Sequence, residues 1–206
     1  MIEPDWNVRE KVRAFVTTRS SGDGLSRLPS EPVWLRQVHG NAVADMDFTK
    51  EMTPADAAVA RRPGVVCAVK VADCMPVFFA DESTSVVGVA HAGWRGLSSG
   101  VLENTIERMK AKNLRAWMGP AIGPRVYEVG EDVREAFEGH EYAFVPTRPG
   151  HWNLDLYAVA RKKLESLKVE VFGGGFCTYS DAERFYSYRR DGSTGRMAAY
   201  IWLAPA

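Results

Sequence analysis

VVCAVKVADCMPVFFADESTSVVGVA, residues 65–90, is the stretch that decides the fold. It contains three near-continuous apolar runs, which are Val65–Val71, Val77–Ala80 and Ser85–Ala90. Such runs are typical of strands that are buried on both faces. We therefore predict that these three segments form central strands of the protein.

Outside this stretch, apolar residues recur with strand or helix periodicity. From Ser98 to Met109 their spacing predicts a helix, which Ser98 or Ser99 could cap. The other predicted helices are Glu131–Phe137 and Leu154–Leu167, and the other predicted strands are Arg13–Arg19, Val33–Val38, Ala42–Met46, Leu114–Met118, Val169–Phe172 and Met197–Leu203. Ser20–Pro32 is rich in Gly, Ser and Pro and is predicted to be a loop. Because no repeat or linker is visible, we expect one α/β domain over residues 1–206, with a mixed sheet or two packed sheets.

The composition is ordinary for a soluble globular protein. Hydrophobic residues make up 46% and charged residues 25% of the 206-residue chain, and 26 basic residues balance 26 acidic ones. This balance argues against nucleic acid or an anionic membrane as a partner, and no apolar run is long enough to span a bilayer. The polar start, Met1–Trp6, lacks the pattern of a signal peptide. Three cysteines without disulfide-like spacing favour the reducing cytoplasm.

Candidate site residues lie at or near the ends of apolar runs. His39 follows Val33–Val38, Cys74 lies between two runs, and His91 follows Ser85–Ala90. A sheet could bring these side chains together, and two imidazoles with one thiolate can hold one zinc ion and leave a fourth position open, as catalytic zinc sites do. Taken singly, His39 could be a surface residue at a turn, and Cys74 could be a buried inert thiol.

Cys67 is not assigned to this site. It lies seven positions before Cys74, and on one straight strand the two thiols would point to opposite faces. Cys67 is therefore predicted to be a core residue. Pro76 lacks an N–H group and is expected to mark a bend after Cys74.

An anion-binding turn is expected after His91. Gly93 and Gly96 flank Trp94 and Arg95 before a helix, so backbone N–H groups and the Arg95 guanidinium suit a phosphate. The same glycines could serve only the packing of a tight connection between strand and helix.

Two acidic residues and one arginine-rich stretch also have alternative interpretations. Asp73 could orient a histidine or a bound water as a neighbour of the metal ligands, or it could cap a turn, and Asp56 has the same two interpretations. The stretch Tyr186–Arg196 gathers three arginines around an Asp-Gly turn. It could be a hairpin with a solvated rim or part of an anion pocket.

At these residues the chain resembles the YfiH family (DUF152), which also carries the label multicopper polyphenol oxidase laccase. The likeness runs from about Val33 to the C-terminus. The matching segments are Trp34–Gly40, Ala55–Ala57, Val66–Phe79, Val89–Gly96, Gly119–Pro124, Tyr127–Gly130, Leu154–Leu156 and Phe185–Arg196. Several long motifs in the same order make this resemblance more specific than any single pattern.

The resemblance implies a four-layer α/β/β/α fold with mixed sheets. It also implies a purine nucleoside phosphorylase that acts on adenosine, inosine and S-methyl-5′-thioadenosine with inorganic phosphate, and that has adenosine deaminase activity. His39, Cys74 and His91 match the family's zinc-binding catalytic centre. Asp73 is expected to be a further catalytic residue, and the expected substrate- or phosphate-binding residues are Gln37, Arg95, Arg189 and Arg190.

The chain departs from the family pattern in one place and from the laccase label in another. Family members usually have a longer segment before the Gln-Val-His-Gly motif, whereas here only Ser20–Pro32 follows Thr17-Thr18-Arg19. If the absent part walls the pocket, we expect an altered substrate range or a weak activity. Copper prefers imidazole-rich sites, and four histidines without a His-x-His pair cannot surround several coppers. Copper is therefore expected only as an alternative occupant of the three-ligand site.

Two other functions are compatible with the same residues. A cysteine hydrolase of the deamidase type would use Cys74 as nucleophile and His91 as base, because a thiol beside an imidazole is activated as a thiolate. A non-catalytic partner or metal-storage protein is the second alternative, and the balanced charge gives it no support.

Overall fold

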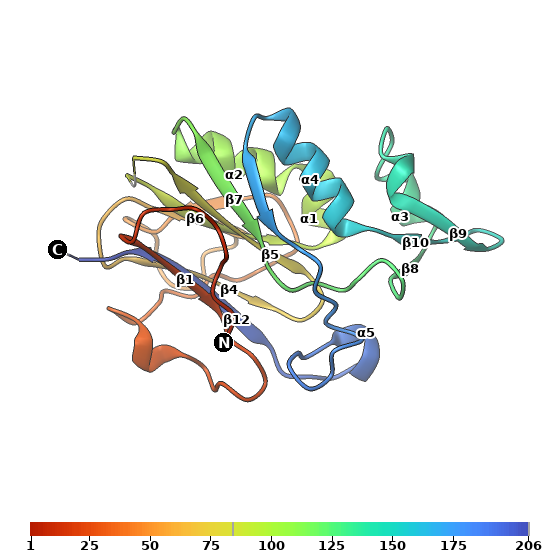
Figure 1. Ribbon diagram of the computed structural model, residues 1–206, viewed down its shortest axis with the longest axis horizontal. Coiled ribbons are helices and arrows are strands. Elements are labelled where there is room, and N and C mark those ends of the chain that lie inside the picture. Colours follow the sequence, from red (N-terminus) through yellow and green to blue (C-terminus); the bar gives the residue numbers. More distant parts are fainter. Residues whose placement is uncertain (84, 206) are drawn as a thin grey trace.

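The computed structural model describes residues 1–83 and 85–205. Two β-sheets pack face to face in the middle of the molecule, and helices cover the outer face of the larger sheet (Figure 1). This layered arrangement of mixed sheets and helices in one domain confirms the predicted fold class.

The larger sheet has six strands in the order β11-β7-β5-β6-β3-β2. It consists of β2 (Val43–Asp45), β3 (Ala57–Ala60), β5 (Met75–Asp81), β6 (Val87–Ala92), β7 (Leu114–Met118) and β11 (Glu170–Gly173). The pairs β11/β7 and β2/β3 are parallel, and the other neighbours are antiparallel. Every residue of β3, β5 and β6 is buried, as expected where both faces of a sheet are covered.

The smaller sheet joins the two ends of the described chain. Its antiparallel order is β1 (Val12–Val16), β12 (Met197–Leu203) and β4 (Val66–Val71). Alternate residues of β4, namely Cys67, Val69 and Val71, lie in the apolar cluster between the two sheets. Cys67 is fully buried there, which confirms its predicted place in the core.

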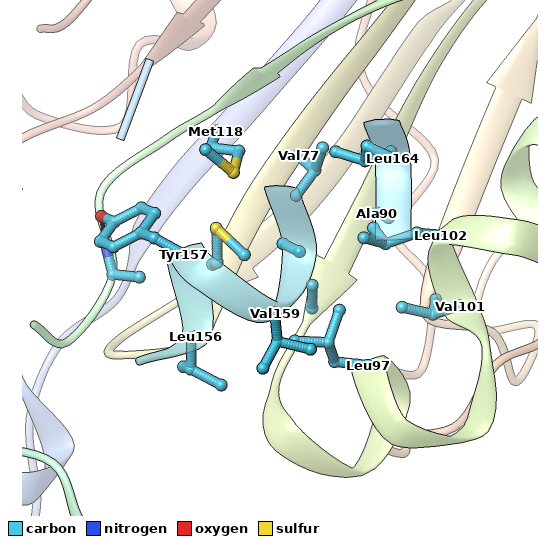
Figure 2. Packing of buried hydrophobic residues seen from close by; sticks show 14 of the residues in the cluster. Val77, Ala90, Leu97, Val101, Leu102, Met118, Leu156, Tyr157, Val159 and Leu164 are labelled. Atoms are coloured by element: carbon cyan, nitrogen blue, oxygen red, sulfur yellow. Dashed lines mark hydrogen bonds between the residues drawn. The ribbon is translucent and has the colours of Figure 1, made fainter. Parts of the chain in front are cut away.

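Three helices pack on the outer face of the larger sheet. They are α1 (Trp94–Ser99), α2 (Val101–Met109) and α4 (Leu156–Ser166). Figure 2 shows Leu97, Leu102 and Leu164 from these helices gathered against Val77 and Ala90 of the sheet. Burial of each such leucine contributes about 1.5–3 kcal/mol to folding. Asp155 caps α4 by accepting a hydrogen bond from the N–H of Ala158.

A third, small sheet lies at one end of the molecule (Figure 1). It pairs β8 (Glu128–Gly130) and β9 (Phe144–Arg148) with β10 (His151–Leu154), next to α3 (Glu131–Glu135) and the 3-10 turn η2 (Glu141–Ala143). α5 (Tyr188–Asp191) belongs to the loop that precedes β12. None of the described helices is long and apolar enough to cross a membrane.

The outer face of the smaller sheet has only a thin cover. Phe15, Tyr200 and Trp202 lie on this face, and Leu28 and Trp34 pack against them. The covering segment contains a single 3-10 turn, η1 (Leu25–Arg27). In this chain the fourth layer is thus a short segment.

Several local predictions differ from the structure. Val33–Val38 is not a strand, because Arg36 makes only an isolated bridge with Pro54 and the next N–H groups bind the carboxylate of Asp56. Pro76 marks no bend but lies near the start of β5, opposite His91. Proline is tolerated near a strand's beginning.

Other corrections concern helices and short strands. Neither Ser98 nor Ser99 caps a helix, because α1 already begins at Trp94 and Gly100, in a left-handed conformation with φ of 95°, separates α1 from α2. Tyr186–Arg196 is not a hairpin, since it contains α5. The strands β3, β8, β9 and β10 were not predicted. Three of them have only three or four residues, too few to show a periodicity.

Candidate metal centre and its cleft

His39, Cys74 and His91 meet at one point. Their ligand atoms all lie within 4.8 Å of one another, and the two imidazole ring centroids are 4.9 Å apart. The three residues come from the loop before β2, the turn before β5 and strand β6. The predicted convergence of these side chains is confirmed.

The pairing of β5 with β6 sets Cys74 beside His91. Pro76 lies opposite His91 and Met75 opposite Ala92, so the residue before β5 reaches the end of β6. Gly93 follows β6, and a Cβ atom at Gly93 would lie 2.8 Å from Sγ of Cys74. Only glycine at this position leaves room for the thiol.

Asp56 holds both histidines in place. Its buried Oδ1 lies 2.9 Å from Nδ1 of His91, and its carboxylate accepts hydrogen bonds from the N–H groups of Val38, His39 and Gly40 at 3.1, 2.9 and 2.8 Å. These three bonds stabilise a left-handed conformation at His39, where φ is 60°. With Nδ1 bound to Asp56, the Nε2 atom of His91 is left for a ligand, the usual arrangement of a metal-binding histidine.

The electrostatics of the cluster favour a thiolate. Burial by itself raises the pKa of Cys74, but the hydrogen bonds and charges of His39 and His91 outweigh burial and lower the pKa to about 6. Burial by itself lowers the pKa of His91, but Asp56 and Cys74 raise it to about 9. At neutral pH the metal-free cluster therefore holds a thiolate beside an imidazolium. The thiolate is the form of cysteine that binds metals and the form that acts as a nucleophile.

The donor set fits a metal ion. Two imidazole nitrogens and one thiolate are usual zinc ligands, and a catalytic zinc site keeps a fourth position open. His39 is exposed and Cys74 is partly exposed, so a small molecule can reach this position. Copper accepts the same ligand types. No other group of three such side chains is found in residues 1–83 and 85–205.

The cluster opens into a cleft of about 750 Å³. Three aromatic rings, those of Trp94, Tyr127 and Tyr188, line it. The cleft also has five cationic side chains, which are Arg36, Lys70, Arg95, Arg189 and Arg196. Asp73 is the single carboxylate among the described lining residues. A concave site of this volume, with aromatic rings and a few polar groups, suits a small-molecule ligand.

Arg95 and Arg189 line the cleft. The guanidinium of Arg95 lies 4.3 Å over the ring of Trp94. The guanidinium of Arg189 lies 5.1 Å over the ring of Tyr127 and donates to the carbonyl oxygen of Glu128 at 2.7 Å. Both side chains therefore present donors to a ligand in the cleft.

Gln37 and Arg190 have their side-chain groups occupied by the protein. The amide of Gln37 lines the cleft but exchanges two hydrogen bonds, of 2.9 and 2.8 Å, with the backbone of Lys70. The guanidinium of Arg190 donates to three backbone carbonyl oxygens and pairs with Asp191. The structure does not bring Arg190 to the cleft, and it gives Gln37 the task of holding its segment against β4.

Asp73 ties a wall of the cleft to the turn that carries Cys74. Its Oδ1 accepts a hydrogen bond from the hydroxyl of Thr178 at 2.6 Å, and its Oδ2 accepts one from the N–H of Arg189 at 2.7 Å. Both oxygens are thus occupied by residues more than a hundred positions away in the chain. Asp73 therefore positions Arg189, and neither histidine is its hydrogen-bond partner.

The sequence analysis missed most of the cleft lining. Lys70 carried a signal, because it is the one charged residue within the apolar run Val65–Val71. Arg36, Tyr127 and Tyr188 lie in segments that match the family motifs, but no periodicity or spacing marks their side chains as part of a cleft, because the path of these segments depends on the rest of the fold.

The chain is similar to known proteins over nearly its whole length. A model of the family described as multi-copper polyphenol oxidoreductase laccase matches residues 7–204. A purine nucleoside phosphorylase of Pseudomonas aeruginosa is 44% identical over 237 positions, which cover 98% of each chain. The purine nucleoside phosphorylase YfiH of Escherichia coli is 48% identical over 183 positions, which cover 85% of this chain and 75% of the relative. The crystal structure of a DUF152 protein from Neisseria meningitidis matches with a TM-score of 0.91 and 36% identity, over 99% of each chain.

Proposed function

The chain belongs to the family described as multi-copper polyphenol oxidoreductase laccase. Because its relatives in Pseudomonas aeruginosa and Escherichia coli are named purine nucleoside phosphorylases, we propose that it is a purine nucleoside phosphorylase with adenosine deaminase as a second activity. Its substrates are adenosine, inosine and S-methyl-5′-thioadenosine, together with inorganic phosphate. The observation that carries the proposal is the cluster of His39, Cys74 and His91 on a cationic, aromatic-lined cleft. A multicopper oxidase activity is not part of the proposal, because four histidines cannot surround several copper ions.

Phosphorolysis needs a phosphate held beside the ribose. Arg95 and Arg189 suit this role, because guanidinium groups donate paired hydrogen bonds to phosphate oxygens. Arg95 makes no side-chain hydrogen bond or ion pair with a described residue, so its donors are free. A phosphate oxygen attacks the anomeric carbon, and the carbon–nitrogen bond breaks with its electron pair leaving on the purine.

The purine and the ribose would rest on the aromatic walls. Trp94 and Tyr188 offer ring faces for the base. Burial and the Cys74 thiolate raise the pKa of Tyr127, against the opposing effect of Arg189. The phenol of Tyr127 therefore stays protonated and can donate a hydrogen bond to the departing base.

Zinc is the proposed metal, with copper as an alternative occupant. Held by His39, Cys74 and His91, it would supply a Lewis acid and a water of lowered pKa for deamination. Asp56 keeps His91 in the required tautomer and keeps the backbone at His39 in its turn. The carboxylate of Asp56 stays ionised, because its pKa is lowered overall. Burial raises this pKa, but the hydrogen bonds from His91 and from the backbone lower it by more.

Residues 1–206 form one catalytic domain, which works in the reducing cytoplasm. All three cysteines are free, and Cys74 must stay reduced to bind a metal. The segment of residues 20–32 is shorter than the corresponding segment of most family members, so we expect a substrate range that differs from theirs.

Metal analysis of the purified protein together with a nucleoside assay tests this function. Adenosine and phosphate should give adenine and ribose 1-phosphate, and inosine should form by deamination. Cys74→Ala should lose metal and turnover together, whereas Cys177→Ser, at a cysteine outside the cluster, should keep both. Full phosphorolysis by metal-free Cys74→Ala protein would refute the metal assignment.

A cysteine hydrolase is the second candidate, and two observations favour it. The pKa of Cys74 is lowered to about 6 by its histidine neighbours against the effect of burial, and Asp56 orients His91 as in a nucleophile–base–acid arrangement. A chelator would leave such an activity intact and a thiol alkylator would remove it. The phosphorylase proposal predicts that both reagents remove activity.

A further inference from the structure

The cleft carries more positive charge than one phosphate neutralises. Five cationic side chains line it, and the single lining carboxylate described, Asp73, already has both oxygens bound. A bound phosphate adds about −1.5 to −2 charge near neutral pH. Roughly two positive charges therefore stay uncompensated after a phosphate has bound.

These cations are not engaged in ion pairs. No described carboxylate lies within salt-bridge distance of these five arginine and lysine side chains, although arginines elsewhere, such as Arg61, Arg148 and Arg184, are paired. Unpaired cations in a concave surface focus a positive potential that attracts anions. The surplus charge is thus available to a ligand.

The cations fall into two groups by the elements that carry them. Arg95, near the start of α1, lies 4.3 Å over the ring of Trp94, and Arg189, in α5, lies 5.1 Å over the ring of Tyr127, so both guanidinium groups sit on aromatic rings that line the cleft. This inner pair is the one assigned to inorganic phosphate above. The guanidinium of Arg196 is held by its own neighbours, because it donates to the carbonyl oxygens of Thr194 and Gly195.

Arg36 and Lys70, which we call the outer pair, come from two other elements, the loop before β2 and strand β4. Lys70 is the exposed residue of β4, with its ammonium 4.3 Å above the ring of Trp34. The two hydrogen bonds between the amide of Gln37 and the backbone of Lys70 hold the segment that carries Arg36 against β4. Neither Arg36 nor Lys70 donates a side-chain hydrogen bond to a described residue, and both line the cleft.

We propose that Arg36 and Lys70 form a second anion subsite, which binds the 5′-phosphate of a purine nucleoside monophosphate. The inference rests on the proposed function for the place of the nucleoside. In a β-nucleoside the 5′ carbon and the base lie on the same face of the ribose, and an attacking phosphate approaches the anomeric carbon from the opposite face. The two phosphates therefore need different cations, as the inner and outer pairs provide.

The test compares inosine with inosine 5′-monophosphate by titration calorimetry in phosphate-free buffer. Neither probe can be phosphorolysed there, and neither has an amino group to lose. We expect the wild-type protein to bind the monophosphate at least about tenfold more tightly than inosine, since charge-assisted hydrogen bonds are strong. The advantage should shrink as salt is added.

Matched variants assign the advantage to the outer pair. Arg36→Gln with Lys70→Met keeps the side-chain stems and should bring the affinity ratio close to one. The control, Arg125→Gln with Lys162→Met, removes two exposed cations outside the cleft and should keep the wild-type ratio. Circular dichroism verifies that both doubly substituted proteins are folded.

Three results would overturn the inference. These are equal affinities in the wild type, failure to bind either probe, and a ratio that survives loss of the outer pair. A protein that prefers the monophosphate but does not cleave inosine in phosphate buffer would leave the subsite standing and would contradict the phosphorylase proposal instead.

Discussion

Asp56 and His91 are joined by a hydrogen bond of 2.9 Å between Oδ1 and Nδ1, and both side chains are buried. The same carboxylate binds the N–H groups of residues 38–40. One acidic residue thus positions two of the three proposed metal ligands, from strand β6 and from the loop before β2. The third ligand, Cys74, is positioned separately by the pairing of β5 with β6.

Asp56→Asn should weaken metal binding about 10- to 100-fold, the usual cost of losing a partner of a ligating histidine. An amide has one acceptor oxygen, so it cannot serve both His91 and the three N–H groups. Competition with a chelator of known affinity measures the effect. Asp132→Asn, at an exposed site in α3, is the control and should bind metal normally. Unchanged affinity in Asp56→Asn would show that the fold alone positions the histidines.

The thiolate of Cys74 should be detectable in metal-free protein from the pH dependence of its alkylation rate. The pKa is lowered to about 6, because His39 and His91 outweigh the raising effect of burial. The rate of alkylation by iodoacetamide should therefore rise as the pH increases through about 6 and level off near neutrality. For an ordinary thiol the rate rises through a pH of about 8.5 instead.

The experiment uses a Cys177→Ser background, because the pKa of Cys177 is also lowered. Burial raises this pKa, but the hydrogen bonds with Ser180 and with backbone groups of Gly123 and Tyr179 together outweigh burial. Cys67 should not react, since it is buried and burial raises its pKa well above the ordinary value. A midpoint near that of a free thiol would contradict the proposed charge state of the cluster.

The central strands and the three ligands could be predicted because each carries a local signal. Val77–Ala80 reads as a buried strand without knowledge of its neighbours, and Cys74 and His91, next to such runs, are visible in the sequence. His39 was found although the run before it, Val33–Val38, is not a strand. The helices from Val101 and from Leu156 follow from their apolar spacing.

The roles of Asp73 and Asp56 could not be predicted, because their partners are distant in the chain, and the role of Arg190 could not be predicted because it depends on the path of the loop that carries it. Asp73 binds Thr178 and Arg189, which lie 105 and 116 positions later. An arginine that binds phosphate and one that binds carbonyl oxygens look the same in a sequence. Only the path of the loop before β12 separates Arg189, in the cleft, from Arg190, outside it.

Substitution of these two neighbouring arginines should have different effects. Arg189→Ala should raise the KM for phosphate roughly tenfold or more, because a charged hydrogen bond contributes about 1.5–3 kcal/mol. Arg190→Ala should lower the melting temperature by several degrees, since its guanidinium donates to the carbonyls of Thr178, Tyr179 and Phe185 and about 1 kcal/mol corresponds to 2–4 °C in a chain of this size.

Initial rates at varied phosphate and thermal unfolding measure the two effects. Arg125→Ala, an exposed arginine outside the cleft, should change neither value. A lowered melting temperature without a change in KM for Arg189→Ala would remove this residue from the phosphate site.

Gly93→Ala tests whether the room left for the thiol of Cys74 matters. The added Cβ atom would lie 2.8 Å from Sγ of Cys74, well inside contact distance, so the thiol must move away from the two histidines. Crowding of this kind costs about 1–3 kcal/mol. We expect loss of metal and of turnover, measured by metal analysis and the nucleoside assay. Gly40→Ala is the matched control, because its added methyl group would meet its nearest neighbours at 3.6 and 3.7 Å, an ordinary contact. If Gly93→Ala retains metal as Gly40→Ala does, the thiol has freedom to shift and the close approach at Gly93 does not position it.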